Sequence, residues 1–457
     1  MPADRTRLPP LGPDPSFTFP EISKRALANG LRVWTVEHHD VPLVAVLLLL
    51  PTGAAADPDD RPGLAAMTGD MLDEGCGDRS ALDVHDALGR LGAHFDVEVG
   101  SDATLLGLTT LARFAGKGLE LVADMARRPR FERKEFDRVR ELRLTRLLQL
   151  RDLAPAVADR AFAQLVYRGH PYGHLPIGTE ASLRDMALGE VTAFHQGSFA
   201  PARATLIAVG DALHDELFDH ADRAFGSWST SNDAGRGKTP DPASVEPPAT
   251  PADRLALVHR PGSAQSELRI GHAAVPRSTP DYHALIVLNM ILGGQFVSRI
   301  NMNLREDKGF TYGARTAFDF RRGRGPFVLQ VSVQTDATAD AISESLAELA
   351  AIRGPRPATG GELALARAAL TRGYPRSFET AEQVARAAAQ LALYGLPDDY
   401  FSRFVARVSA VDSSEVTRVA HEHLDPARFL TVVVSDREKI GPSLARLDLG
   451  ASELAVT

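Results

Sequence analysis

Arg305 and Tyr312, seven residues apart in this sequence, are side chains whose types and spacing could do chemistry. They lie in the stretch GGQFVSRINMNLREDKGFTYG, which runs from Gly293 to Gly313. A tyrosine hydroxyl can donate a hydrogen bond to a carbonyl oxygen that develops negative charge, and a guanidinium can pair with a carbonyl or a carboxylate. The same two residues also fit a solvated helix end followed by a strand, so their types alone leave both interpretations open.

The elements that would position this pair follow from the surrounding residues. Gly293-Gly294 is expected to open a helical segment whose apolar residues are Phe296, Val297, Ile300, Met302 and Leu304. A charged turn closed by Gly309 then leads through Tyr312 into alternating sequence, which is typical of a strand. The pattern therefore predicts a helix, a turn and a strand.

The order of residues in this stretch resembles the second-half motif of the pitrilysin-like zinc peptidases, a family that includes insulin-degrading enzyme and mitochondrial processing peptidase. The positions that match are Gly293, Gly294, Ser298, Arg299, Leu304, Arg305, Glu306, Gly309 and Tyr312. The resemblance implies that this half carries no metal. It also implies that Arg305 and Tyr312 hold substrate at a zinc site in the other half or in another subunit.

In the same family, a helix of the first half carries His-x-x-Glu-His. Two histidines four residues apart share one helix face and bind zinc, and the glutamate acts as the general base. The corresponding helix here, expected over 63–74, has Ala66, Gly69 and Asp70 at those three positions. Two of these replacements have no coordinating or basic group.

The acidic third ligand of the family also has no counterpart. Counting on from Asp70 places it near Leu147, and no glutamate occurs between Glu141 and Glu180. One carboxylate does not hold a catalytic zinc ion, which in such sites has three protein ligands. We therefore expect this chain to bind no metal, and the family resemblance implies that the zinc is carried by a partner subunit.

The other candidate metal ligands are expected to have structural or surface roles. His170 and His174 are four apart, but Pro171 and Gly173 make the segment between them a turn. The two histidines of His421-Glu422-His423 fall on different helix faces and are expected to be exposed to solvent. Cys76, the only cysteine, is expected to be a small packed residue and cannot form an intrachain disulfide.

The two halves of the chain repeat one another at an offset of 225 residues (415 − 190 and 436 − 211). The identities are Glu190-Val191-Thr192, Pro201-Ala202-Arg203, Val209 and Asp211, which reappear as Glu415-Val416-Thr417, Pro426-Ala427-Arg428, Val434 and Asp436. Each copy mixes strands and helices, so the predicted class is α+β. Residues 41–51 are apolar on both strand faces, which predicts a central strand in a covered sheet. The resemblance implies two homologous halves that form half of a clam-shell chamber.

Composition shifts divide the chain into five segments. The expected organisation is an extended N-terminal arm (1–24), a first α+β domain with the degenerate zinc site (25–225), a linker (226–253), a second α+β domain with Arg305 and Tyr312 (254–440) and a C-terminal tail (441–457). The linker is rich in Ser, Pro, Gly and Asp.

The composition is that of a soluble globular protein: 44% hydrophobic and 24% charged residues in a chain of 457. The net charge of −8 and the pI near 6.0 give no electrostatic reason to expect nucleic acid or an anionic membrane as a partner. The first residues contain no apolar signal-peptide core, which favours a cytoplasmic protein, or a periplasmic one if the chain is already processed.

Together these features and the family resemblance lead to one hypothesis and two alternatives. The hypothesis is a non-catalytic, substrate-binding subunit of a heterodimeric zinc metalloendopeptidase, inactive alone, which supplies Arg305 and Tyr312 to the zinc site of a homologous partner that carries His-x-x-Glu-His. Peptide is expected to bind as an added strand on a sheet edge. The alternatives are a structural or assembly subunit without a role in catalysis, and a stand-alone enzyme with unrecognised ligands.

Overall fold

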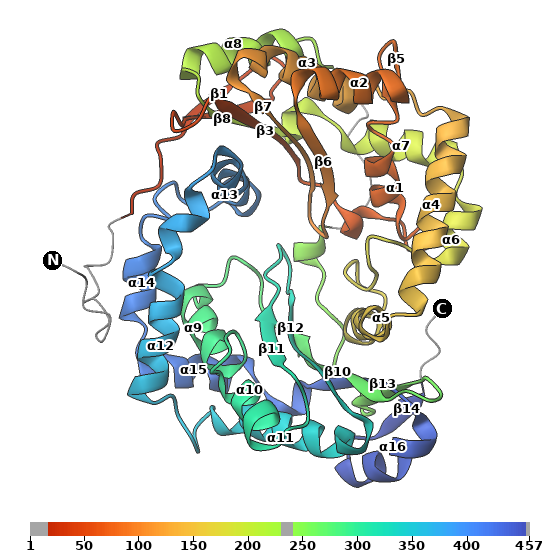
Figure 1. Cartoon of the computed structure of the whole chain (residues 1–457), viewed down its shortest axis with the longest axis vertical. Coiled ribbons are helices and arrows are strands. Elements are labelled where there is room, and N and C mark those ends of the chain that lie inside the picture. The colour runs from red at the N-terminus through yellow and green to blue at the C-terminus, as the bar shows by residue number, and fades with distance from the viewer. Residues whose placement is uncertain (1–16, 230–240, 454–457) are drawn as a thin grey trace, which may run out of the picture.

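The computed structural model describes residues 17–229 and 241–453 and contains two α+β halves (Figure 1). Each half is built on one six-stranded sheet. The strand order is β1-β2-β8-β3-β7-β6 in the first half and β14-β9-β13-β10-β12-β11 in the second. The predicted α+β class and the two related halves are therefore confirmed.

The strands have the following bounds. The first sheet contains β1 (Ser23–Ala26), β2 (Arg32–Glu37), β3 (Leu43–Leu50), β6 (His94–Val99), β7 (Thr104–Leu111) and β8 (Thr205–Gly210), and a separate pair is formed by β4 (Gly75–Cys76) and β5 (Arg79–Ser80). The second sheet contains β9 (Leu255–His259), β10 (Gln265–Ala273), β11 (Ala314–Phe318), β12 (Pro326–Gln334), β13 (Leu430–Ser435) and β14 (Ala451–Glu453).

The helices follow the same division. The first half contains α1 (Leu64–Asp70), α2 (Ala81–Leu91), α3 (Ala115–Arg127), α4 (Arg133–Arg151), α5 (Ala154–Tyr167), α6 (Glu180–Asp185), α7 (Leu188–Ser198) and α8 (His214–Phe225). The second contains α9 (Tyr282–Leu292), α10 (Arg299–Asn301), α11 (Thr338–Ala351), α12 (Gly360–Thr371), α13 (Ala381–Tyr394), α14 (Phe404–Ala410), α15 (Ser413–His423) and α16 (Arg437–Leu444).

The internal repeat of the sequence corresponds to repeated elements. Helix α15 begins 225 residues after α7 (413 − 188), and β13 begins 225 residues after β8 (430 − 205). Strand β8 pairs parallel with β2 and antiparallel with β3. Strand β13 pairs in the same way with β9 and β10. The repeated residues thus form the same helix and central strand in each half.

Strand β3 is covered on both faces, as its apolar sequence predicts. Val44, Val46, Leu48 and Leu50 belong to the core beneath the outer helices. Ala45 and Leu47 pack on the opposite face against α13. A strand that alternates between two apolar layers needs apolar residues at every position.

Each half contributes one helix that packs on the sheet of the other half. Helix α5 of the first half packs on β10 and β13 of the second sheet, and α13 of the second half packs on β3 and β8 of the first sheet. Figure 1 shows both helices between the two sheets. Arg386 on α13 also pairs with Asp96 (3.3 Å) and Glu98 (2.8 Å) on β6. The exchange ties the halves together and leaves the outer helices to cover the remote faces.

Two boundaries of the predicted segments fall inside regular elements. Strand β1 crosses the boundary at 24/25, and α16 crosses that at 440/441. Parts of the predicted arm, linker and tail, namely residues 1–16, 230–240 and 454–457, lie outside the described residues. Within residues 17–229 and 241–453, no helix has the length and apolar character needed to cross a membrane.

Candidate substrate-binding site

The glycine pair of the motif brings the end of α9 against β11. A Cβ on Gly293 would lie 2.6 Å from the amide nitrogen of Thr316, and one on Gly294 would lie 2.9 Å from the Cα of Met290. Neither distance is possible for a real side chain, because neighbouring backbone is in the way. The amide of Thr316 also donates to the Gly293 carbonyl at 3.2 Å. The pair therefore fixes the strand that follows Tyr312.

The expected helix after the glycine pair begins later than predicted. Residues 293–298 form a turn, α10 starts at Arg299, and residues Met302–Asp307 form the π-helix η5. Phe296 and Val297 are 59% and 50% exposed in that turn, so they pack on no core. Asn301 accounts for part of the difference, because its side chain donates to the Phe296 carbonyl and accepts from the Ala314 amide.

Arg299 of the motif has a structural role that the sequence did not indicate. Its side chain is 5% exposed and donates to both carboxylate oxygens of Glu362, at 2.6 and 2.8 Å. It also donates to the carbonyls of Arg356 and Pro357. The bond from Arg299 is the main reason why the pKa of Glu362 falls to about 2. Arg299 therefore anchors the start of α10 to α12 and does not face the pocket.

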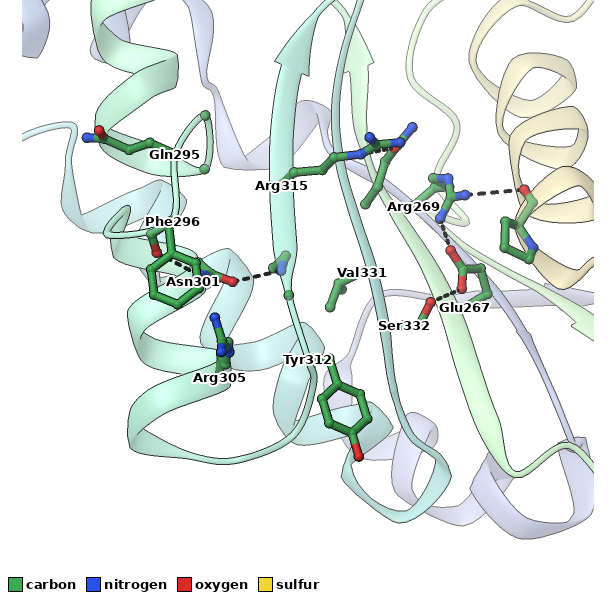
Figure 2. Close-up of a pocket in the computed structure, with 16 residues that line it drawn as sticks. Glu267, Arg269, Gln295, Phe296, Asn301, Arg305, Tyr312, Arg315, Val331 and Ser332 are labelled. Carbon is green, nitrogen blue, oxygen red and sulfur yellow. Dashed lines mark hydrogen bonds and ion pairs between the residues drawn. The ribbon is translucent and has the colours of Figure 1, made fainter. Parts of the chain in front are cut away.

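Arg305 and Tyr312 line one pocket at the start of β11, with a volume of about 550 Å³ (Figure 2). Arg305 extends from η5 over the ring of Phe296, with 4.2 Å between the guanidinium carbon and the ring centroid. Its one ion pair among the described residues is with Glu306, at 3.4 Å. Arginine on an exposed aromatic face keeps its outward hydrogen-bond donors available.

Tyr312 is 92% exposed, and its hydroxyl makes no hydrogen bond within the described part of the chain. Figure 2 shows the ring directed away from Arg305, on the other side of the strand start. The fold thus brings the two predicted residues to one pocket, but their side chains do not converge on one point in the isolated chain. A group that touches both must lie across the mouth of the pocket.

The floor of this pocket contains buried charges that sequence reasoning missed. Arg269 on β10 is buried, donates to Glu267 and donates to Asp159 of α5 at 2.6 Å. Glu267 in turn accepts from the Ser332 hydroxyl. The available signal was a glutamate and an arginine in the middle of an otherwise apolar strand, where charges are buried only when paired.

The four positions of the family zinc site lie where α1 meets α4 and β6. Ala66 is buried, and Leu147 of α4 is packed in the first core. A Cβ on Gly69 would lie 2.8 Å from Val99 Cγ2 and 3.2 Å from Val97 Cγ1 of β6. The position of the family's general base is therefore closed by the strand.

Asp70 is held by an arginine rather than by a metal. Arg143 of α4 donates to Asp70 Oδ2 at 2.6 Å and to the Pro176 carbonyl at 2.8 Å. The same helix carries Leu147 one turn later. Zinc requires several N, S or O donors, whereas these positions offer one carboxylate that already pairs with a guanidinium. The residues at the four positions do not fit a zinc ion.

Helix α1 ends at Asp70 and not at Glu74 as expected. Residues 71–74 form a turn and bends after the C-cap Met71, and Gly75, with a φ of +113°, begins β4. A groove of about 420 Å³ remains between α1 and β6, lined by Asp70, Asp73, Phe95 and Val97 among others.

One prediction about the histidines was wrong. His423 is not solvent-exposed: its side chain is 13% exposed and lies 2.7 Å from Asp281 Oδ2. Asp281, Glu422 and His423 are the one group with metal-ligand geometry in residues 17–229 and 241–453. Asp281 also pairs with Arg418 at 2.5 Å, so a cation already occupies its other oxygen.

The remaining candidates are structural, as expected. The ring of His170 lies 3.0 Å from the Val245 carbonyl and accepts from the Tyr172 amide. His174 lies 3.1 Å from Asp57, which also accepts from the amides of Gly63 and Ala65 at the start of α1. Cys76 is fully buried, and burial raises the pKa of its thiol to about 11.

Two family models cover most of the chain. Residues 32–180 match the insulinase family (peptidase family M16), and residues 185–370 match the peptidase M16 inactive domain. An uncharacterized zinc protease of Bacillus subtilis is 22% identical over 331 residues, which are 72% of this chain and 78% of that protein. An uncharacterized zinc protease of Mycobacterium tuberculosis is 26% identical over 320 residues, 69% of this chain and 71% of that protein.

A subunit of a larger enzyme is also among the similar proteins. The mitochondrial-processing peptidase subunit beta of Rattus norvegicus is 23% identical over 291 residues, 64% of this chain and 58% of that protein. Among solved structures, a peptidase M16 inactive domain from Pseudomonas fluorescens superposes with a TM-score of 0.82 at 23% identity, over 91% of this chain and 98% of that one. A protease from Helicobacter pylori gives 0.85 at 21% identity, over 91% and 100%.

Proposed function

This chain belongs to the peptidase M16 family, and we propose that it acts there as the non-catalytic, substrate-binding subunit of a heterodimeric zinc metalloendopeptidase. The partner is a homologous chain that carries His-x-x-Glu-His and the zinc ion. This chain contributes Arg305 and Tyr312 to the cleavage site of the partner.

The observation that carries the proposal is the exposure of Tyr312. A tyrosine that is 92% exposed and finds no hydrogen-bond partner in the described part of the chain contributes almost nothing to the stability of that chain. It stands at the mouth of a pocket in which Arg305 keeps free donors. Such a pair is suited to a peptide carbonyl whose oxygen gains negative charge, provided that another molecule closes the pocket.

The residues at the zinc-site positions support the proposal that the zinc is bound by a partner chain and that this chain binds substrate. The similar bacterial proteins are named zinc proteases. In this chain, the Asp70–Arg143 ion pair occupies the corresponding place. The similar mitochondrial protein is named as one subunit of a processing peptidase, which makes a partner chain a reasonable expectation.

The sheet edges support a peptide site on the first half of this chain. The outer edge of β11 is already used, because the Ala314 and Thr316 amides donate to Asn301 and Gly293. Strand β6 is the last strand of the first sheet, and no described strand pairs with its outer edge. A peptide can add to β6 by main-chain hydrogen bonds, while another part of the same peptide reaches the partner's metal.

The test is a reconstitution with an unstructured peptide as substrate. The purified chain, a His-x-x-Glu-His homologue from the same organism and the mixture are compared for cleavage and zinc content. We expect cleavage to be strongest in the mixture and zinc to be on the homologue. Cleavage with stoichiometric zinc in this chain alone would overturn the proposal, and unchanged cleavage on mixing would favour an assembly role.

A further inference from the structure

A second pocket, of about 620 Å³, lies between the two halves and shares no lining residue with the Arg305 pocket. The first half contributes Glu98 and the turn 100–103 that joins β6 to β7. The second half contributes Arg277, Phe320 and, from α13, Tyr394. The peptidase proposal above makes no use of this pocket.

Arg277 is the unusual residue of this pocket. It is only 5% exposed, and its guanidinium carbon lies 3.7 Å from the ring centroid of Tyr282, 4.8 Å from that of Tyr400 and 5.8 Å from that of Tyr394. No ion pair of the described residues includes Arg277. Aromatic faces attract a cation but replace only part of the hydration that burial removes.

The other charges around the pocket already have partners. Arg386 pairs with Asp96, Glu98 and Glu382, and Arg321 pairs with Asp319 at 2.7 Å. Asp102 accepts from the Tyr172 hydroxyl at 2.6 Å and from the Arg322 amide at 2.8 Å.

The tyrosines cannot supply the missing negative charge. Burial raises the pKa of Tyr394 and that of Tyr400 to about 12, so both hydroxyls stay protonated at neutral pH. Arg277 lies close enough to the Tyr400 hydroxyl to hydrogen-bond with it, so this tyrosine is a neutral partner and not a counter-ion. The pocket thus presents one uncompensated, buried cation among polar donors, which is an arrangement that selects an anion.

We propose that the Arg277 pocket binds a carboxylate of the peptide, an inference that rests on the proposed peptide-binding function. The position supports this source of the anion. Phe95, Asp96 and Val97 of β6 line the groove beside α1, and Glu98 at the end of the same strand lines the Arg277 pocket. A peptide added along the six residues of β6 extends over about 20 Å and delivers its next residue to Arg277. The carboxylate is either the C-terminus of the peptide or an Asp or Glu side chain.

Calorimetric titration of the full-length chain distinguishes these two sources. The probes are variants of one unstructured peptide that is long enough to span β6 and whose parent sequence contains no Asp or Glu. One ends in a free carboxylate and one in an amide, and two further amides carry an internal Glu or Gln. We expect a carboxylate-bearing peptide to bind about 30-fold more tightly than its neutral counterpart, because a buried charge gains a partner. The end-group pair and the Glu/Gln pair show which source is used.

Variants assign the preference to the pocket. Arg277→Met should abolish it, and Arg277→Lys should retain part of it. Arg90→Gln, which removes an exposed charge from α2, should leave it unchanged. Thermal unfolding checks that Arg277→Met is folded. If it is not folded, the carboxylate preference of Arg277→Lys is compared with that of the wild type, and a reduced preference in Arg277→Lys assigns it to Arg277. Equal binding of all peptides would overturn this inference and leave the proposed function intact. Absence of binding by every peptide would overturn both.

Discussion

Arg143 Nη1 lies 2.6 Å from Asp70 Oδ2, so that a guanidinium on α4 neutralises the carboxylate on α1 at a position that corresponds to the His-x-x-Glu-His motif. The Arg143 side chain is 9% exposed, whereas that of Asp70 is 43% exposed. The cation is therefore the buried member of the pair. One charge-assisted hydrogen bond thus joins the two helices at this position.

Removing the carboxylate should leave that buried cation unpaired. We expect Asp70→Ala to lower the free energy of unfolding by about 2 kcal/mol, less than for a fully buried pair because Asp70 is partly exposed. The double variant Asp70→Ala/Arg143→Met should recover most of the loss, since no charge remains buried. Urea unfolding of both variants measures this. A single variant as stable as the wild type would contradict the role assigned to Arg143.

Restoring only the short motif should not restore a zinc site. The variant Ala66→His/Gly69→Glu/Asp70→His retains Arg143 as a nearby cation and Leu147 as an apolar third position. Its glutamate must also displace Val97 and Val99 of β6. We expect less than stoichiometric zinc by elemental analysis and a lower melting temperature. The matched variant adds Arg143→Ala and Leu147→Glu and is expected to bind more zinc. Full zinc occupancy in the triple variant would refute the argument.

Tyr312→Phe should impair cleavage by the proposed heterodimer and leave the fold intact. Loss of one hydrogen-bond donor to a developing oxyanion costs about 10²–10³ in rate. Because the side chain is 92% exposed, the stability should change by no more than about 0.5 kcal/mol. Arg305→Gln should behave similarly. Steady-state cleavage by the mixture of chains is the measurement, with Arg90→Gln as the control. An unchanged kcat/KM in Tyr312→Phe would remove Tyr312 from the site.

The Arg299–Glu362 pair should make stability depend on acidic pH. The hydrogen bond from Arg299 lowers the pKa of Glu362 from 4.5 to about 2 in the folded chain. A lowered pKa stabilises the fold above pH 4.5, and this contribution is lost as the pH falls towards 2. Glu362→Gln should therefore be less stable than the wild type at neutral pH.

The difference between Glu362→Gln and the wild type should shrink between pH 4.5 and pH 2. Melting temperatures across that range test it, and Glu379→Gln at an exposed position serves as the control. A difference that stays constant with pH would show that Glu362 stabilises the chain through packing and not through its charge.

Local patterns predicted much of the fold and part of the site. The 225-residue repeat became α7 with α15 and β8 with β13, because identical residues at one offset build identical local units. The apolar run of β3 became a strand covered on both faces. Phe296 and Val297 were wrongly placed in a helix, because side-chain bonds of Asn301 hold a turn there that apolar spacing does not encode.

The sequence by itself determined the α+β class, the duplication, the family motif around Arg305 and Tyr312, and the loss of metal ligands at Ala66, Gly69 and Asp70. Only the tertiary structure decided that Arg143 pairs with Asp70, that α5 and α13 exchange between the halves, and that Arg277 is buried with no anionic partner in residues 17–229 and 241–453. The reason is physical. Residue types and spacing report short-range geometry, whereas a charge acquires its partner, or fails to, only when distant segments pack.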